Sequence, residues 1–279
     1  MLEKLGLGTV QFGQAYGISN QAGQVPKKEA AAILDRAAKA GIRLLDTAAN
    51  YGEAEDILAT LETAPFRVVT KTINLSHGLD RLIARARQSA QSLKADTLLV
   101  HTAGDLRGAE GEALWSALCK LKDEGVFRKI GISAYVADDP AALEDKFRPD
   151  VMQLPFSVLD QRLLADGTLA RLKERGVEVH ARSLFLQGLL FMKELPAKLR
   201  HATPHFVRTR ETLADANITP LTAALGFALS RPEIAFGLVG VTSRKELEEI
   251  IAAAKMPLPR LDWSSFALKD ELVLTPSLW

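Results

Sequence analysis

Four polar side chains in the N-terminal part of the sequence could together move a proton. Asp46 directly follows a short apolar run, and Tyr51 lies in the segment just after it. Lys71 and His101 each follow a later apolar run. If these runs are neighbouring parallel strands, all four side chains reach the same end of the sheet. An acid, a phenol, an ammonium and an imidazole at one place form a complete set for acid–base chemistry.

The phenol is the group that such a set would use as the acid. A lone tyrosine hydroxyl has a pKa near ~10, and a lysine ammonium close to it favours the phenolate and lowers that pKa. A buried lysine needs a counter-charge, which Asp46 could supply to Lys71. His101 could then donate a hydrogen bond to a substrate carbonyl oxygen while Tyr51 protonates that oxygen. Protonation helps most when hydride reaches the carbon, and since no side chain donates hydride, a reduced nicotinamide is implied.

Each of these residues also has a simpler interpretation when it is taken alone. Asp46 could cap a helix or lie in a loop, and His101 could be a packed core histidine. Lys71 could be a surface residue, or it could form a Schiff base in a barrel lyase that needs no nicotinamide. Their occurrence together, each at or just after the end of a candidate strand, favours the proton-transfer interpretation.

Short runs rich in β-branched residues alternate with segments of helical periodicity along the chain. We expect eight strands, near residues 5–10, 42–47, 67–72, 96–101, 128–133, 150–154, 177–183 and 235–241. Helical patterns lie near residues 28–40, 53–62, 78–93, 110–124, 138–145, 165–175, 205–230 and 243–254. Eight such units favour parallel pairing and a closed (β/α)8 TIM barrel.

A doubly wound nucleotide-binding sheet is the alternative, and it should carry a glycine-rich turn that opens a helix after the first strand. Residues 5–13 hold glycines, but no helical pattern begins directly after them. We therefore expect one barrel domain over residues 1–279, with loops 11–27 and 186–205 and a C-terminal tail, 256–279, around it. Six consecutive strand ends carry polar residues, which indicates a lined pocket: Asp46, Lys71, His101, Ser133, Gln153 and Arg182.

Composition excludes several classes of protein. The chain has 35 basic and 34 acidic residues, for a formal net charge of +1, and no basic stripe that would indicate nucleic-acid binding. No uncharged run approaches the ~20 residues that span a bilayer, and no secretory signal is visible. A single cysteine, Cys119, fits a reducing compartment, so we expect a cytoplasmic protein. His201 and His205 have a metal-like spacing, but Pro204 lies between them, so we interpret them as loop residues and expect no metal site.

The motifs around these residues resemble the aldo-keto reductase family over nearly the whole chain. The resemblance rests on Asp46-Thr47-Ala48, Tyr51-Gly52, Glu55, Thr70-Lys71, His101, Gly131-Ile132-Ser133, Gln153 and Gly240-Val241-Thr242-Ser243. It implies a barrel enzyme that uses a nicotinamide cofactor on a small carbonyl or sugar substrate. It also implies that Tyr51 is the general acid, that Lys71 and Asp46 tune it, and that His101 orients the carbonyl.

The resemblance also implies the cofactor contacts. They come from Gly8, Thr9, Asp46, Ser133, Gln153, Arg182, Ser183, Leu184, Gln187, Gly188, Gly240, Thr242, Ser243, Arg244 and Glu249. Three positions depart from the family pattern: Ala134 replaces an amide, Arg182 replaces an aromatic ring, and Ile250 replaces an asparagine that reads adenine. NADP(H) is favoured because Arg244 and Lys245 could bind a 2′-phosphate, and NAD(H) use is the alternative. Some relatives are nucleotide-binding regulatory subunits, so a non-enzymatic role stays open, and the sequence does not indicate an oligomeric state.

Overall fold

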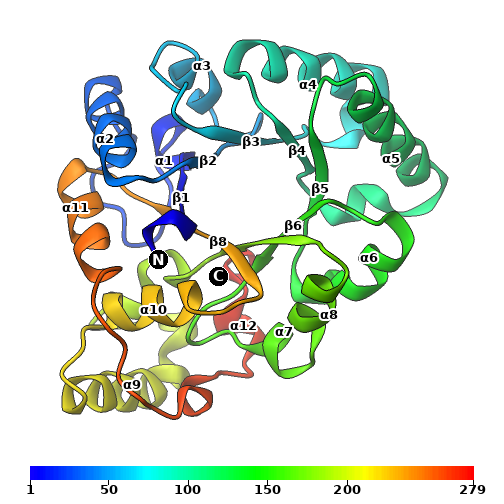
Figure 1. The fold of residues 1–279 in the computed structure, drawn as a ribbon. Helices are drawn as coiled ribbons and strands as arrows, with labels where there is room; N and C mark the ends of the chain where they lie inside the picture. Colours follow the sequence, from blue (N-terminus) through cyan, green and yellow to red (C-terminus); the bar gives the residue numbers. More distant parts are fainter.

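Eight parallel strands close into a barrel in the computed structural model, which describes residues 1–279 apart from the side chain of Ser277. The strands are β1 (Leu5–Gly8), β2 (Leu44–Asp46), β3 (Arg67–Lys71), β4 (Thr97–Val100), β5 (Lys129–Ser133), β6 (Val151–Pro155), β7 (Glu178–Arg182) and β8 (Ile234–Gly240). Each strand pairs with its neighbours in sequence, and β1 also pairs with β8 to close the ring (Figure 1). The predicted (β/α)8 fold is confirmed.

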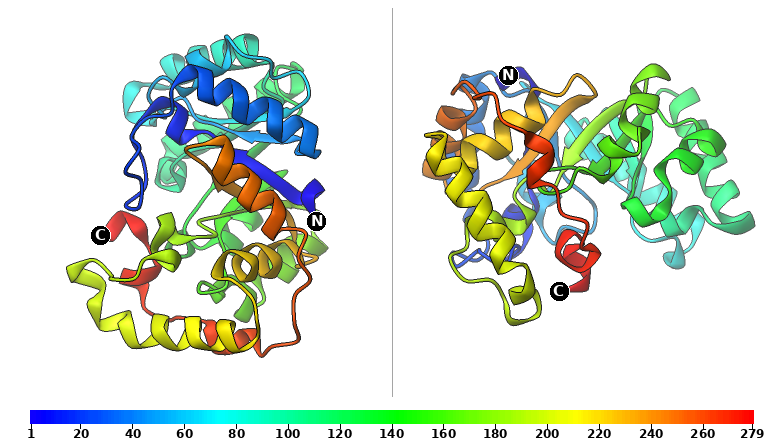
Figure 2. Two further views of the ribbon diagram at one scale, coloured as in Figure 1. Left: turned by 90° about the vertical axis from the view of Figure 1, so that its left-hand side faces the viewer. Right: turned by 90° about the horizontal axis from the view of Figure 1, so that it is seen from below.

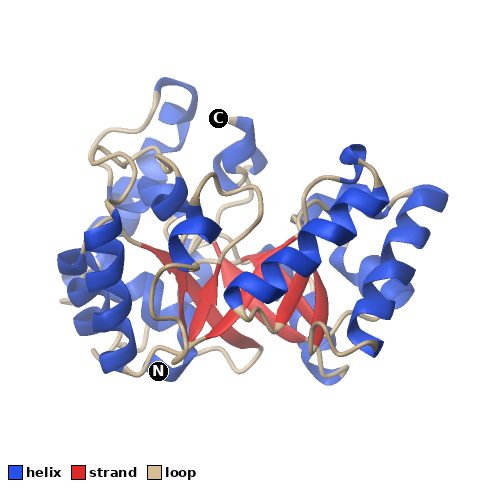
Figure 3. Ribbon diagram, turned by 90° about the horizontal axis from the view of Figure 1, so that it is seen from above, coloured by secondary structure: helices blue, strands red, loops and turns tan.

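Helices form a ring around the strands in Figure 1, and Figure 3 shows the strands between them from the side. They are α1 (Val10–Gly13), α2 (Lys27–Ala40), α3 (Ala54–Leu58), α4 (Leu79–Leu93), α5 (Gly108–Asp123), α6 (Pro140–Phe147), α7 (Arg162–Ala165), α8 (Thr168–Glu174), α9 (Thr203–Asp215), α10 (Pro220–Leu229), α11 (Arg244–Ala253) and α12 (Glu271–Leu274). In α2, Ile33 and Ala37 are buried, as the periodicity predicts. Gly41 ends this helix with φ 88°, a left-handed conformation that glycine adopts without strain.

Two helical predictions need correction. The segment predicted as one helix over 205–230 forms two, because Asn217 turns left-handed (φ 60°) and Pro220 starts a new helix whose N-cap, Thr219, accepts a hydrogen bond from the Thr222 N–H. A one-turn helix, α1, also begins directly after β1, where no helix was expected.

Two apolar layers hold the barrel together. Inside it, Leu44, Val69, Leu99 and Val151 form a small buried cluster with Leu238. Outside it, alternate residues of the same strands pack against the helices in one large core. This alternation is the period of two that places successive side chains on opposite faces of a strand. It leaves the last inward-facing residue of each strand at one end of the barrel.

The C-terminal tail packs against the segment that follows β6. The Leu268 N–H donates to the Leu159 carbonyl, and Gln161 donates through Nε2 to the Trp263 carbonyl at 2.6 Å. The two termini of the chain lie at opposite ends of the barrel (Figure 2). Within the described residues, no helix is both long and apolar enough to span a membrane.

The two histidines with metal-like spacing instead attach the tail to the region after β7. His201 lies in a short 3-10 helix, and its Nε2 is 2.6 Å from Asp270. His205 lies inside α9, with its Nε2 2.9 Å from the Phe266 carbonyl. Their prediction as loop residues is therefore wrong, because Pro204 occupies the first turn of α9, where proline is tolerated, and does not interrupt the helix.

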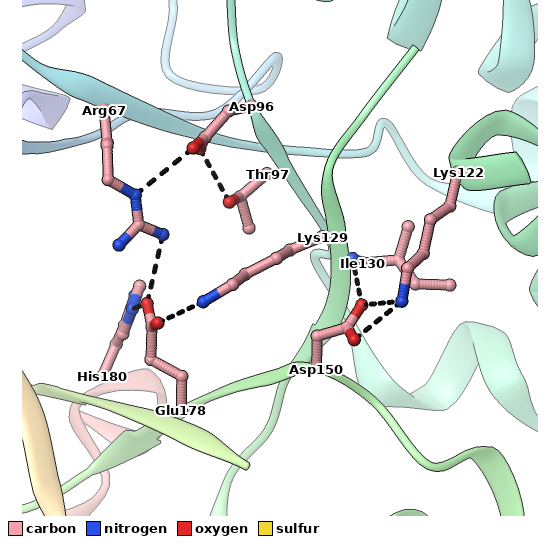
Figure 4. A network of polar contacts seen from close by, with 9 residues as sticks. All are labelled: Arg67, Asp96, Thr97, Lys122, Lys129, Ile130, Asp150, Glu178 and His180. Atoms are coloured by element: carbon pink, nitrogen blue, oxygen red, sulfur yellow. Dashed lines mark hydrogen bonds and ion pairs between the residues drawn. The ribbon is translucent and has the colours of Figure 1, made fainter. Parts of the chain in front are cut away.

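A polar network fills the barrel at the start of the strands (Figure 4). Glu178 accepts hydrogen bonds from Lys129 and from Arg67 Nη2, the latter at 3.3 Å, and it lies 2.8 Å from His180 Nε2. Arg67 Nε also reaches Asp96 at 3.3 Å. Burial alone would raise the pKa of Glu178, but its hydrogen bonds to His180 and Lys129 and the charge of Arg67 lower the pKa well below the ordinary value.

We predict that Glu178→Gln lowers the free energy of unfolding at pH 7 by about 1–2 kcal/mol. This is less than the ~3–5 kcal/mol for breaking a fully buried pair, because these side chains are partly exposed. Because folding lowers the pKa of Glu178, its carboxylate stabilises the fold at pH values above about 4.3, the ordinary pKa of glutamate. That stabilisation is lost as the pH falls below this value. Urea unfolding should therefore show the gap between wild type and variant narrowing from pH 5 to pH 3.

Glu112→Gln provides the control, because Glu112 pairs with Lys146 on the exposed surface. It should leave the unfolding midpoint close to that of wild type. A Glu178→Gln variant as stable as wild type at pH 7 would contradict the role given to the network.

Candidate active site

The ends of the strands bring together the polar residues that the sequence singled out. Asp46, Lys71, Ser133 and Arg182 are the last residues of β2, β3, β5 and β7, and His101 directly follows β4. The register pairs Ser133 with Gln153 and Gly8 with Asp46, so these positions lie at similar heights in the ring. Tyr51 lies in the loop between β2 and α3.

Lys71 is buried at the centre of this layer, with 1% of its surface exposed. Its Nζ donates to both carboxylate oxygens of Asp46 at 2.7–2.8 Å and to the Thr47 carbonyl at 2.9 Å. The Tyr51 hydroxyl oxygen lies 3.2 Å from the same Nζ. Burial alone would lower the pKa of Lys71, but the charge of Asp46 and the contact with Tyr51 leave the pKa above its ordinary value. The ammonium is therefore charged at neutral pH.

Asp46 is held from several sides. Gln153 donates to its Oδ1 through Nε2 at 2.6 Å, and the Thr9 hydroxyl donates to its backbone carbonyl at 3.0 Å. Because Lys71 also donates to both carboxylate oxygens, the counter-charge is fixed in place. A buried side chain can keep such a charge only with its acceptors paired in this way.

Glu55 anchors the loop that carries Tyr51. This buried residue of α3 accepts a hydrogen bond from Thr70 of β3, and from Arg85 (2.5 Å) and Ser89 (2.8 Å) of α4. The cluster ties the helix after the Tyr51 loop to the strand that carries Lys71. This anchoring keeps the phenol close to the ammonium.

His101 faces Tyr51 edge-on, with ring centroids 5.6 Å apart and an interplanar angle of 81°. Burial and the charges of Lys71 and Arg182 lower the pKa of His101 to about 4, although Asp46 acts in the opposite direction. Its imidazole is therefore neutral at pH 7 and carries one N–H. The buried Nδ1 has no hydrogen-bond partner in the described residues.

A cavity of about 1000 Å³ opens above this layer. Its volume is at the upper end of the ~300–1,000 Å³ typical of ligand pockets. The predicted site residues that line it are Gly8, Asp46, Tyr51, His101, Ser133, Gln153, Arg182, Ser183, Leu184, Gln187, Gly188, Gly240, Thr242 and Glu249. Lys71 lies beneath its floor, and Thr9, Ser243 and Arg244 are not among the lining residues. The cavity thus runs from Tyr51 and His101 to the start of α11.

Several lining residues were not identified from the sequence as site residues. They include Gln11, Asn50, Tyr135 and Glu246. They come from α1, from loops and from α11, where no strand pattern fixes the direction of a side chain. The described residues of the C-terminal tail do not line the cavity.

Arg182 is positioned by Tyr135. Its guanidinium carbon lies 4.1 Å from the centroid of the Tyr135 ring, and Nη2 donates to the Ala134 carbonyl at 3.1 Å. No carboxylate forms an ion pair with Arg182 in the described part of the chain. The flat guanidinium is therefore free to stack on a ligand ring on its cavity side.

Two loops meet across the cavity. The Ser19 hydroxyl donates to the Gln187 carbonyl at 3.0 Å, and Gln187 donates through Nε2 to the Tyr16 hydroxyl at 3.1 Å. Gly188, with φ 91°, packs against Ser19 so closely that a Cβ would lie 2.0 Å from the serine oxygen. The loop after β7 therefore needs glycine at this point to close against loop 11–27.

The described residues contain no group of three or more His, Cys, Asp or Glu side chains placed to hold a metal ion. The acid–base residues and the cavity above them are the chemical features of this face. The ammonium, phenol and neutral imidazole could together protonate an oxygen of a ligand in the cavity.

The comparisons with known proteins agree with the resemblance in sequence. The chain is 29% identical over 277 residues to L-galactose dehydrogenase of Arabidopsis thaliana, covering 89% of this chain and 83% of the relative. It is 29% identical over 178 residues to glyoxal reductase of Bacillus subtilis (strain 168), covering 60% of this chain and 62% of the relative. Its fold matches the holo form of an aldo-keto reductase from Bacillus halodurans with a TM-score of 0.74 and 19% identity, over 99% of this chain and 93% of the other. The sequence profile of the aldo/keto reductase family matches residues 4–271, and the chain belongs to that family.

Proposed function

We propose that the protein is an oxidoreductase that reduces an aldehyde or ketone, or oxidises the corresponding alcohol or sugar, with a nicotinamide dinucleotide as hydride carrier. The observation that carries this proposal is the contact of Lys71 Nζ with both the Asp46 carboxylate and the Tyr51 hydroxyl, beside His101. Family membership supports an oxidoreductase acting on small carbonyl or sugar substrates. The predicted cytoplasmic location stays a prediction.

The cavity suits a nicotinamide dinucleotide. Its volume can take an elongated ligand, and in its wall Gly240 lies so close to Gln11 that a Cβ would be 2.6 Å from the Gln11 amide. Ser133 and Gln153 would hold the nicotinamide amide, and Arg182 would stack on its ring. When bound, the reduced ring supplies hydride to the substrate carbon.

The protein's own residues would handle the proton. Tyr51 would donate its hydroxyl proton to the substrate oxygen as charge develops there, and the Lys71 ammonium would stabilise the phenolate that remains. Asp46 keeps that ammonium protonated and in place. The neutral imidazole of His101 would donate a hydrogen bond to the same substrate oxygen, which orients the carbonyl. In the oxidative direction Tyr51 would take the proton back.

The contacts of Lys71 disfavour the Schiff-base alternative. A lyase lysine must lose its proton to attack a carbonyl, so it needs a lowered pKa. The raised pKa of Lys71 and its four acceptors, Asp46 Oδ1 and Oδ2, the Thr47 carbonyl and the Tyr51 hydroxyl, keep the ammonium charged and occupied. The remaining alternative is a regulatory subunit that binds a nucleotide without turnover. Such a subunit would bind the nucleotide but catalyse no hydride transfer, so loss of the Tyr51 hydroxyl would have no turnover to affect.

We predict that Tyr51→Phe lowers kcat/KM for an aldehyde such as 4-nitrobenzaldehyde by about 10²–10⁴-fold, because the proton donor is lost. The dissociation constant for the reduced cofactor, measured by fluorescence titration, should change by less than about threefold, since the ring stays in place. Tyr135→Phe is the matched control, because it removes the hydroxyl of a second phenol that lines the cavity but keeps the ring that packs against Arg182, and it should keep most of the activity. Unchanged turnover in Tyr51→Phe would contradict the assignment, and trapping of substrate on Lys71 by borohydride would favour the lyase.

We also predict that His101 stays neutral far below the ordinary histidine range. Its lowered pKa means that it gains a proton only as the pH falls to about 4. Imidazole ¹⁵N chemical shifts followed by NMR from pH 8 to pH 4, with His101→Asn to assign the signal, measure this directly. A titration near the ordinary value of about 6.5 would show that the imidazole is not held neutral by the site.

A further inference from the structure

Carboxylates occupy the end of the cavity that would hold the adenosine of the cofactor. Glu246 and Glu249, both on α11, line this end together with Thr242. Glu246 accepts hydrogen bonds from the Thr242 N–H at 2.6 Å and from the Thr242 hydroxyl at 2.9 Å. The Glu246 carboxylate therefore already binds the Thr242 N–H, which a phosphate at this point would need as a hydrogen-bond donor.

A second carboxylate reaches the same helix end from a distant part of the chain. Glu29, in the first turn of α2, accepts a hydrogen bond from the Arg244 N–H at 2.6 Å. α2 and α11 lie side by side on the barrel, which allows this contact (Figure 1). The Glu246 N–H is also used, because it donates to the Ser243 hydroxyl at 3.2 Å. The N–H groups of Thr242, Arg244 and Glu246 are thus all bonded within the chain.

The cation that could clamp a 2′-phosphate is also engaged elsewhere. Arg244 donates through Nε to Glu248 at 3.0 Å, and Arg36 lies 3.5 Å from the same carboxylate. Neither Arg244 nor Lys245 lines the cavity. The two residues that made NADP(H) the favoured cofactor in the sequence therefore lie outside the cavity lining.

We propose that the protein uses NAD(H) in preference to NADP(H), and that Glu246 and Glu29 set this preference. The inference rests on the proposed nicotinamide cofactor. A 2′-phosphate carries about −1.5 to −2 charges at pH 7 and would meet the Glu246 carboxylate in the cavity lining, with the Glu29 carboxylate next to it at the start of α11, while the nearby arginine is already paired with Glu248. A ribose 2′-hydroxyl can instead donate a hydrogen bond to a carboxylate, which is how an acidic residue selects NAD(H) in other nucleotide sites.

The test compares the binding of NADH and NADPH to the purified full-length protein by fluorescence titration. We expect wild type to bind NADH at least about tenfold more tightly than NADPH at low salt. The difference between the NADH and NADPH affinities should narrow as salt is added, because added ions screen the repulsion between the 2′-phosphate and the carboxylates. Glu246→Gln and Glu29→Gln each keep a hydrogen-bond acceptor but remove the charge. Each should tighten NADPH binding several-fold while NADH binding changes by less than about threefold.

Glu110→Gln is the matched control. Glu110 lies at the third position of α5, as Glu246 does in α11, but it is remote from the cavity lining. This variant should leave both dissociation constants unchanged. Displacement of bound NADH by ADP but not by 2′-phospho-ADP would support the inference independently of the nicotinamide.

The outcomes separate the two proposals. Tighter binding of NADPH than of NADH by wild type would overturn the NAD(H) preference and leave the oxidoreductase proposal in place. Unchanged NADPH affinity in both glutamine variants would overturn the role of Glu246 and Glu29. Failure of the protein to bind either dinucleotide would overturn the proposed function itself.

Discussion

A buried ammonium at the end of β3 must find acceptors for its hydrogens, and the barrel supplies all of them from adjoining segments. Asp46 comes from β2, the Thr47 carbonyl from the residue after it, and the Tyr51 hydroxyl from the loop beyond. Taking both charges out of water is costly, and removal of one partner from such a pair typically costs about 3–5 kcal/mol. The charge state of Lys71 and its contact with the phenol thus depend on one ion pair.

The interior of the barrel separates two kinds of charged layer. At the start of the strands, Glu178 is surrounded by Arg67 and Lys129, and this layer stabilises the fold. At their ends, the pair of Asp46 and Lys71 lies under the cavity. The apolar cluster of Leu44, Val69, Leu99, Val151 and Leu238 lies between the two layers on the same strands. The fold can therefore keep its stabilising charges away from the residues that would contact a substrate.

Features that depend on strand periodicity could be predicted from the sequence. All eight strands and the convergence of Asp46, Lys71 and His101 depend on apolar runs that end in polar residues, and those runs are local. Contacts between segments far apart in the chain were not predictable in this way. The hydrogen bond from Arg244 to Glu29 joins residues 215 positions apart, and no local pattern marks Glu29 as part of the site. The same holds for the link between Tyr16 and Gln187, which depends on loop conformations with positive φ at Gln187.

In the mechanism proposed above, Lys71 acts on the reaction through Tyr51, and a double-mutant cycle on the rate of hydride transfer tests this coupling most directly. Single-turnover rates would be measured by stopped flow for wild type, Tyr51→Phe, Lys71→Met and the double variant, each checked for folding by circular dichroism. We predict that each single change slows the step by about 10²–10⁴-fold and that the double variant is no slower than Tyr51→Phe, because residues that act as a unit are non-additive. Losses that multiply in the double variant would show that the two residues act independently and would contradict the proposed coupling.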